Sequence, residues 1–199
     1  MLVQNSLQVI QVVRRFGPVG GMESYVWNLS RELVKLGCSV LVICEENHDT
    51  GSCPELTILF VEKGWARPRW IGLLQFSFRV SRLIKSRKLK AQIIHSHERT
   101  AVHNVTTFHG PPFALIRDLP FWKWLSIRVA AHLFMESREL LRSQVSRIIP
   151  NSRVISEQLL RCYPTASSKL TKPIPPGVAW IPLRPPQRMD SSGAVIGLS

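Results

Sequence analysis

A glycine-rich turn at residues 17–23 (GPVGGME) is the first segment whose residues could do chemistry. An apolar run at 7–13 precedes it and an amphipathic run at 22–36 follows, which predicts a strand, a tight turn and a helix. Free backbone N–H groups at a helix start lie at the positive end of the helix dipole and suit a phosphate. The turn has neither the G-x-G-x-x-G nor the P-loop pattern, so a turn without a ligand is the alternative. We expect an anion site at Gly20 and Gly21.

Polar side chains follow two later apolar segments. His97, Glu98 and Arg99 come after one of these segments, and His109 comes directly after the next. Ligands of open α/β sheets bind at the carboxyl ends of the strands. We therefore expect these four residues to contact sugar hydroxyls or phosphate groups. The alternative for His109 is an ordinary histidine in a surface loop.

Residue types that bind metals do not form a metal-binding pattern in this sequence. The four cysteines are scattered, with no C-x-x-C pair, which favours reduced thiols in a reducing compartment. A zinc site can be drawn from several histidines, but their spacing does not support it: His95, His97, His103 and His109. We expect no metal and no other cofactor.

The elements that must position these residues alternate between strands and helices, which predicts an α/β fold. The expected fold is a Rossmann-like, mostly parallel sheet flanked by helices. The expected strands are 7–13, 40–44, 56–61, 92–95, 105–108 and 145–149, the helices 22–36, 70–86, 121–142 and 152–162, with a short extended segment at 170–175. Nine residues separate 92–95 from 105–108, too few for a helical crossover. We expect these two strands to pair antiparallel, or one of them to lie at an edge.

The charge of the chain is strongly positive. Of its 199 residues, 26 are Lys or Arg and 13 are Asp or Glu, a formal charge of +13. Such a charge suits nucleic acid, an anionic membrane or a phosphorylated substrate. The sequence carries no nucleic-acid-binding signature, so we do not expect nucleic acid as a partner. We also expect no signal peptide and no membrane-spanning helix, because no apolar run reaches about 18 residues.

The segment at 121–142 mixes aromatic and cationic side chains. Trp122, Lys123, Trp124 and Arg128 are of the types that bind the interface of an anionic bilayer. The alternative is a core helix whose cationic face is merely solvated. We keep both interpretations, and name these four residues as a candidate membrane interface.

Five blocks in order carry a resemblance to a known family: residues 17–23, 95–99 (HSHER), 106–110 (TTFHG), 149–152 (IPNS) and 174–178 (IPPGV). Their order and spacing resemble the amino-terminal half of a retaining GT-B glycosyltransferase of family 4. The likeness extends over about residues 7–180 and is greatest to the lipopolysaccharide-core glucosyltransferases. It implies two Rossmann-like domains, of which the first binds the acceptor and the second the nucleotide-sugar.

The resemblance also implies a division of the chain into two parts. Residues 1–181 are expected to form the acceptor-binding domain. Residues 182–199 are expected to hold a linker and the start of the donor-binding domain, with its first strand at 194–197. The paired glutamates and basic residues of that second domain have no counterpart here. The chain alone is therefore expected to be inactive and to need a carboxyl-terminal domain as its partner.

The implied activity is transfer of a hexose from a nucleotide-sugar such as UDP-glucose to a membrane-associated glycan or glycolipid, of the lipopolysaccharide-core kind. The implied place is the cytoplasmic face of a bacterial inner membrane. Two alternatives stay open. One is a family 4 transferase with a different acceptor. The other is a non-catalytic Rossmann-like module that binds a phosphorylated ligand or an anionic membrane surface.

By the resemblance, His109 lies near the reacting sugar and is the candidate catalytic residue. Seven further positions are expected to contact the donor phosphate or the acceptor: Gly20, Gly21, Glu23, His97, Glu98, Arg99 and Arg153. For Glu23 a purely structural role at the helix start is an equal alternative.

Overall fold

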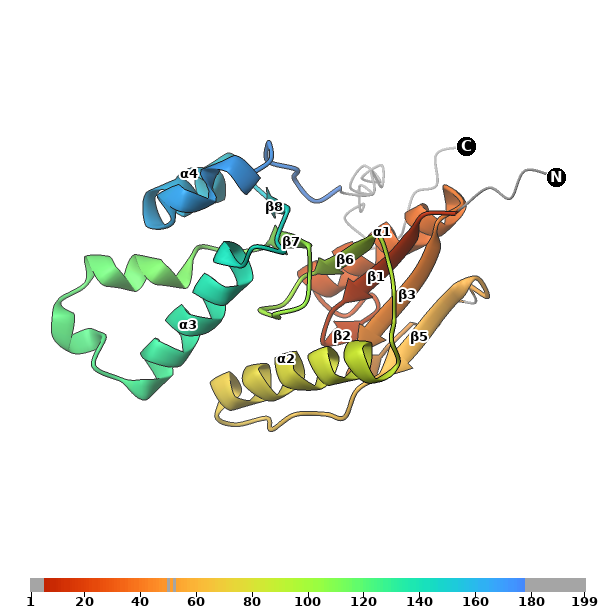
Figure 1. The fold of residues 1–199 in the computed structure, drawn as a ribbon, viewed down its shortest axis with the longest axis horizontal. Coiled ribbons are helices and arrows are strands. Elements are labelled where there is room, and N and C mark those ends of the chain that lie inside the picture. Colours follow the sequence, from red (N-terminus) through yellow and green to blue (C-terminus); the bar gives the residue numbers. More distant parts are fainter. Residues whose placement is uncertain (1–5, 50, 52, 178–199) are drawn as a thin grey trace, which may run out of the picture.

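The computed structural model describes residues 6–49, 51 and 53–177 (Figure 1). Its centre is a six-stranded sheet in the order β5-β3-β1-β6-β7-β8, with every pair of neighbours parallel. The strands are β1 Gln8–Val12, β3 Ser39–Cys44, β5 Leu56–Phe60, β6 Ile93–Ser96, β7 Val105–Phe108 and β8 Arg147–Pro150. Two short strands, β2 Arg15–Phe16 and β4 Glu46–Asn47, pair separately. The predicted α/β class is confirmed.

Helices cover both faces of the sheet. The α-helices are α1 Gly21–Lys35, α2 Arg69–Ser86, α3 Ile127–Leu141 and α4 Arg153–Cys162, with 3-10 helices η1 Phe113–Asp118, η2 Phe121–Lys123 and η3 Pro164–Lys169. Val26 of α1 packs with Val42, whereas Phe76 of α2 packs with Ile43. Because neighbouring residues of a strand point to opposite faces, α1 and α2 lie on opposite sides of the sheet. A third apolar cluster joins β8 to α4.

The pairing of β6 with β7 corrects the antiparallel or edge arrangement expected for these strands. They are parallel, and both are interior, because β1 and β8 flank them. His95 near the end of β6 pairs with Val105 at the start of β7, so the two strands are staggered and overlap little. The loop therefore spans only a short distance from the end of β6 back to the start of β7, and it needs no helix. Asn104 closes this loop, since its Oδ1 accepts a 2.8 Å hydrogen bond from the N–H of Ile94.

The aromatic run at 121–126 corrects the expected start of the third long helix. Helix α3 begins only at Ile127, after the 3-10 turn η2 and an extended Ser126 with φ −141°. Phe121, Trp122 and Leu125 are 65%, 63% and 78% exposed. A helical turn formed by these residues would bury no apolar face, and helical turns without packing are marginal in water.

Three other expectations concern the chain ends. The extended segment after η3 is confirmed in part, since Thr171 and Ile174 donate backbone hydrogen bonds to Ile148 and Pro150. The boundary at 181/182 and the strand expected at 194–197 lie outside the described residues.

Within the part of the chain that the structure describes, no helix has both the length and the apolar character needed to cross a bilayer.

Candidate active site

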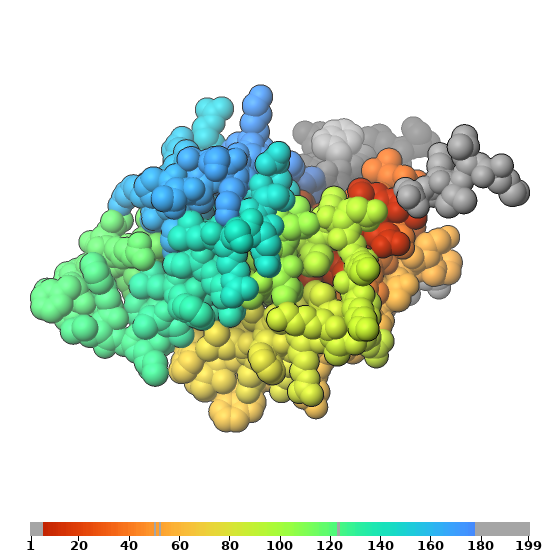
Figure 2. Space-filling model, viewed as in Figure 1, coloured from red at the N-terminus to blue at the C-terminus, as the bar shows by residue number. Residues whose placement is uncertain are grey.

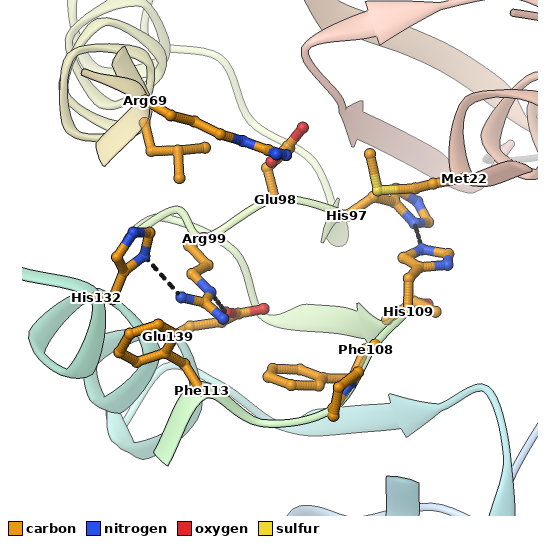
Figure 3. Close-up of a pocket in the computed structure, with 14 residues that line it drawn as sticks. Met22, Arg69, His97, Glu98, Arg99, Phe108, His109, Phe113, His132 and Glu139 are labelled. Carbon is orange, nitrogen blue, oxygen red and sulfur yellow. Dashed lines mark hydrogen bonds and ion pairs between the residues drawn. The ribbon is translucent and has the colours of Figure 1, made fainter. Parts of the chain in front are cut away.

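A cleft of about 440 Å³ opens at the carboxyl-terminal edge of β6 and β7 (Figure 3). The starts of α1 and α2 close one side of it and α3 closes another. Its lining is Met22, Arg69, Leu73, His97, Glu98, Arg99, Thr107, Phe108, His109, Gly110, Pro111, Phe113, His132 and Glu139. The short overlap of β6 and β7 brings the polar residues that follow both strands to the same edge. The cleft therefore lies where open α/β sheets bind ligands.

A chain of hydrogen bonds leads from the sheet to His109. The buried Oε1 of Gln11 lies 2.9 Å from Nε2 of His97. Nδ1 of His97 lies 3.0 Å from Nε2 of His109 (Figure 3). The Tyr25 ring packs edge-on against both imidazoles, with centroid distances of 5.8 and 5.3 Å. Together these contacts hold His109 in one orientation. No described residue hydrogen-bonds to its Nδ1, which is left for a ligand.

The buried histidines His95, His97 and His109 are neutral at neutral pH. Burial lowers the pKa of His109 to about 4 and the pKa of His97 well below its ordinary value. Beside them His95, hydrogen-bonded to Thr107 at 2.8 Å, has a pKa lowered to about 3, again because of burial. Because the Gln11 oxygen accepts from Nε2 of His97, Nδ1 of His97 accepts from Nε2 of His109. Nδ1 of the neutral His109 therefore accepts a hydrogen bond from a sugar hydroxyl, and the ring adds no charge next to a phosphate.

The glycine turn is built around a carboxylate. Nε and Nη2 of Arg15 donate to Oε1 of Glu23 at 3.0 and 2.5 Å, and the Glu23 carboxylate lies against Gly20. A methyl group at Gly20 would collide with that carboxylate, whereas one at Gly21 would meet nothing within 4 Å. A side chain at Gly20 would therefore have to displace the Glu23 carboxylate, whereas the space at Gly21 is open to a ligand. Met22, which stands between Gly21 and Glu23 in the sequence, lines the cleft.

Arg99 belongs to a buried polar network behind the cleft. Its Nη2 lies 2.9 Å from Oε2 of the fully buried Glu136, and its Nη1 lies 3.2 Å from Nδ1 of His132. The Glu136 carboxylate also accepts from the backbone N–H groups of Phe113 and Ala114, at 2.6 and 2.8 Å, and from the Tyr163 hydroxyl at 3.0 Å. Helix α3 thus holds the start of η1, and with it the loop that follows His109.

Two carboxyl groups of the cleft are protonated over part or all of the neutral range. Burial raises the pKa of Glu98 to about 7 and that of Glu139 to about 8. Oε1 of Glu139 accepts a 2.8 Å hydrogen bond from the Thr106 hydroxyl, and its Oε2 has no hydrogen-bond partner among the described residues. A protonated carboxyl both donates and accepts, as hydroxyl-rich ligands require.

Comparison with protein families shows to which family this chain belongs. The model of Glycosyltransferase Family 4 matches residues 19–179, most of the chain. The chain belongs to glycosyltransferase family 4. No curated protein matches the sequence.

Solved structures agree with the fold of a family 4 amino-terminal domain. WaaG, a glycosyltransferase involved in lipopolysaccharide biosynthesis, is 13% identical with a TM-score of 0.70, over 82% of this chain and 44% of WaaG. TcCGT1, solved in complex with UDP, is 13% identical with a TM-score of 0.56, over 90% of this chain and 54% of TcCGT1. The chain thus spans about half the length of these structures. At such identity they show the fold alone.

The structure of this family 4 chain brings together most residues predicted for the site. His97, Glu98, Arg99 and His109 line the cleft, and Gly20, Gly21 and Glu23 adjoin it through Met22. Arg153 does not line it; this residue begins α4 and is exposed. Among the described residues, no group of three or more His, Cys, Asp or Glu side chains is placed to hold a metal ion.

Several residues of the cleft were missed in the sequence: Met22, Arg69, Phe113, His132 and Glu139. Glu136 and Glu139 had a recognisable signal, because they are acidic residues one helical turn apart within an otherwise apolar helix face. For Arg69 and Phe113, neither periodicity nor motif pointed to the site.

Buried histidines and carboxyls of this family 4 domain make opposite contributions to stability as pH changes. His95, His103 and His109 have pKa values lowered from 6.5 to about 3, 4 and 4, chiefly by burial. Their contribution is complete above pH 6.5 and is lost as pH falls toward 4. Glu98 and Glu139 have pKa values raised from 4.5 to about 7 and 8. Their contribution is complete below pH 4.5 and is lost as pH rises toward 8.

We therefore expect the melting temperature to be highest near pH 6.5, the upper end of the histidine range. Below that pH the three histidines outweigh the two carboxyls, at up to about 1.4 kcal/mol per pH unit for each group. Thermal unfolding followed by circular dichroism between about pH 4 and 9 measures the curve. Glu139→Gln should flatten the loss above pH 6.5, and Glu62→Gln, at an exposed position, should not. A melting temperature that climbs steadily to pH 8 would contradict the assignment.

Proposed function

We propose that this chain is the acceptor-binding half of a retaining glycosyltransferase that moves a hexose from a nucleotide-sugar to a membrane-associated glycan or glycolipid. The observation that carries the proposal is the cleft of a family 4 domain in which His109 is held by His97 with one ring nitrogen free for a ligand. Glu98 and Glu139 beside it are suited to hydroxyl groups. The polar groups of the cleft thus match a sugar acceptor.

The chemistry divides between this domain and a donor-binding domain across the cleft. Departure of a nucleoside diphosphate develops negative charge, and stabilising that charge is the main catalytic demand. In our proposal the N-terminus of α1 at Gly21 faces that charge, and Nδ1 of His109 orients the reacting hydroxyl. We place the protein at the cytoplasmic face of a bacterial inner membrane, with lipopolysaccharide core as the acceptor class.

A transfer assay tests this proposal. The chain joined to a family 4 donor-binding domain is incubated with radiolabelled UDP-glucose and glucose-deficient lipopolysaccharide core. We expect label in the glycolipid, and the chain alone should bind core oligosaccharide without transferring sugar. Transfer to a different acceptor would favour another specificity within the family. If neither the chain alone nor the joined protein binds the oligosaccharide, the chain does not have the proposed acceptor-binding role.

An exposed apolar surface between η1 and α3 supports a membrane-held acceptor. We call it the aromatic turn, and its members are Phe121, Trp122, Trp124, Leu125 and Ile127, which are 39% to 78% exposed. The side chain of Lys123 lies outside what the structure describes. Exposed aromatic side chains beside cations such as Arg128 suit the interface of an anionic bilayer. The aromatic turn projects from the domain between η1 and α3 (Figure 1).

We expect the double variant Trp122→Ser with Leu125→Ser to co-sediment with phosphatidylglycerol vesicles at least about tenfold less than the parent chain, because each lost apolar side chain contributes about 1.5–3 kcal/mol when buried. The control is Leu36→Ser with Phe60→Ser, which removes two exposed apolar side chains from α1's end and β5. Equal vesicle binding by the two double variants would show that the aromatic turn is not a membrane interface and that the positive charge of the chain alone attracts it to the vesicles.

A further inference from the structure

A second pocket, of about 270 Å³, lies where α2, α3 and the loop between β6 and β7 meet. It shares no lining residue with the cleft. In the space-filling view α2, in yellow, and α3, in teal, lie against each other (Figure 2). The polar side chains that line this α2–α3 pocket are Ser77, Ser81, Lys85, Arg138, Arg142 and Gln144, and no carboxylate is among its lining residues.

The three cations of the α2–α3 pocket have no acidic partner among the described residues. Lys85, Arg138 and Arg142 form none of the ion pairs found there. Nη2 of Arg138 donates to the Ser77 hydroxyl at 2.9 Å, and Nη1 of Arg142 to the Ala101 carbonyl at 3.2 Å. Both acceptors are neutral, and the Phe134 ring, 5.3 Å from the Arg138 guanidinium, is neutral too, so no described carboxylate balances the charge around this pocket.

The two arginines also repel each other. Arg138 lies in the last turn of α3, Arg142 is the extended residue that follows the helix, and both line the same pocket, so two like charges lie close together. Nε of Arg138 is buried without a hydrogen-bond partner in the described structure. Burial, together with the charge of Arg142, lowers the pKa of the Arg138 guanidinium. An anion in the pocket would relieve the repulsion and offset the cost of this burial.

We propose that the α2–α3 pocket binds a phosphate monoester group. Guanidinium groups match the geometry of phosphate oxygens with paired N–H donors, and a lysine adds a point charge. Arg138 and Arg142 would hold two faces of the phosphate, with Lys85 at the exposed rim. A doubly charged monoester satisfies three cations better than a carboxylate or a phosphodiester, each of which carries a single charge. The group could come from a soluble phosphorylated sugar or from a phosphomonoester lipid headgroup.

Titration of the 199-residue chain tests the proposal. Inorganic phosphate and glucose 6-phosphate are added at constant ionic strength, and amide chemical shifts are followed by NMR. We expect saturable shifts in α2, α3 and the loop that holds Ala101. Vesicles containing phosphatidic acid, compared at equal charge with phosphatidylglycerol vesicles, provide the lipid arm. Tighter binding of glucose 6-phosphate than of inorganic phosphate identifies a soluble ligand. Tighter binding to phosphatidic acid vesicles than to phosphatidylglycerol vesicles identifies a lipid headgroup.

Two variants and one control make the test decisive. Arg138→Gln with Arg142→Gln should weaken phosphate binding at least about tenfold, because each loses charge-assisted hydrogen bonds. Ser81→Asp keeps both arginines and their contacts, and places a carboxylate in the pocket, so it should weaken binding similarly even if the first variant folds poorly. Arg147→Gln with Lys172→Gln removes the same charge from exposed positions elsewhere and should bind like the parent chain. Equal binding by all three, or no saturable binding by the parent chain, overturns the proposal.

Discussion

Replacing Glu136 by alanine should lower the free energy of unfolding by about 3 to 5 kcal/mol, the cost typical of breaking a buried charged network. Glu136 is fully buried and accepts hydrogen bonds from the Arg99 guanidinium, two backbone N–H groups and the Tyr163 hydroxyl. Without the carboxylate, four donors lose their acceptor, and Arg99 keeps only the longer, 4.0 Å contact of its Nε with Oε2 of Glu139. Urea unfolding monitored by fluorescence measures the change.

Two further variants interpret that result. Glu136→Gln keeps an oxygen acceptor for one of the two backbone donors and removes the charge opposite Arg99, so its loss should be intermediate. Glu32→Ala breaks the exposed pair with Lys35 and should cost no more than about 1 kcal/mol. If Glu136→Ala unfolds at the same urea concentration as Glu32→Ala, the network contributes nothing to stability.

His109→Ala should lower kcat by about 100- to 1,000-fold in the chain joined to a donor-binding domain, the range seen when one well-placed hydrogen-bonding group is removed. His109 is placed by His97, which is itself placed by Gln11, so the free ring nitrogen has one preferred position in the cleft. Because that nitrogen acts on the reacting hydroxyl in our proposal, kcat should fall more than KM changes. The transfer assay with labelled UDP-glucose measures both.

The matched control is His48→Gln, at an exposed histidine whose side chain is paired with Glu46 and does not line the cleft. Its kcat should equal that of the parent protein. A melting temperature measured for each variant separates lost chemistry from lost folding. If His109→Ala, still folded, turns over within about twofold of His48→Gln, then His109 is not a catalytic residue.

Both predictions concern one arrangement. The loop that follows His109 begins at Gly110 and reaches η1, whose first backbone N–H groups are held by Glu136. The buried network therefore supports one end of the segment that carries His109, and His97 supports the side chain itself. A loosened Glu136 network is expected to lower turnover as well as stability, even though Glu136 does not line the cleft.

The amino-acid sequence determined the elements and the edge at which the site lies. Continuous apolar runs such as 40–44 are typical of strands covered on both faces, and polar residues directly after such runs must lie at the ligand edge. That local rule placed His97, Glu98, Arg99 and His109 correctly at the cleft. The order of five motifs was enough to indicate the family, which the match over residues 19–179 confirmed.

Only the tertiary structure decided which residues meet. The parallel pairing of β6 with β7 depends on their stagger, and the start of α3 depends on the lack of a surface to cover the aromatic turn. The partner of Arg99 is 37 residues away in Glu136, and that of His97 is 86 residues away in Gln11. Periodicity and capping describe neighbours along the chain, whereas a buried polar group is satisfied by whichever distant side chain packing brings within hydrogen-bond reach. For that reason the sequence located the cleft, and packing selected the contacts that orient its residues.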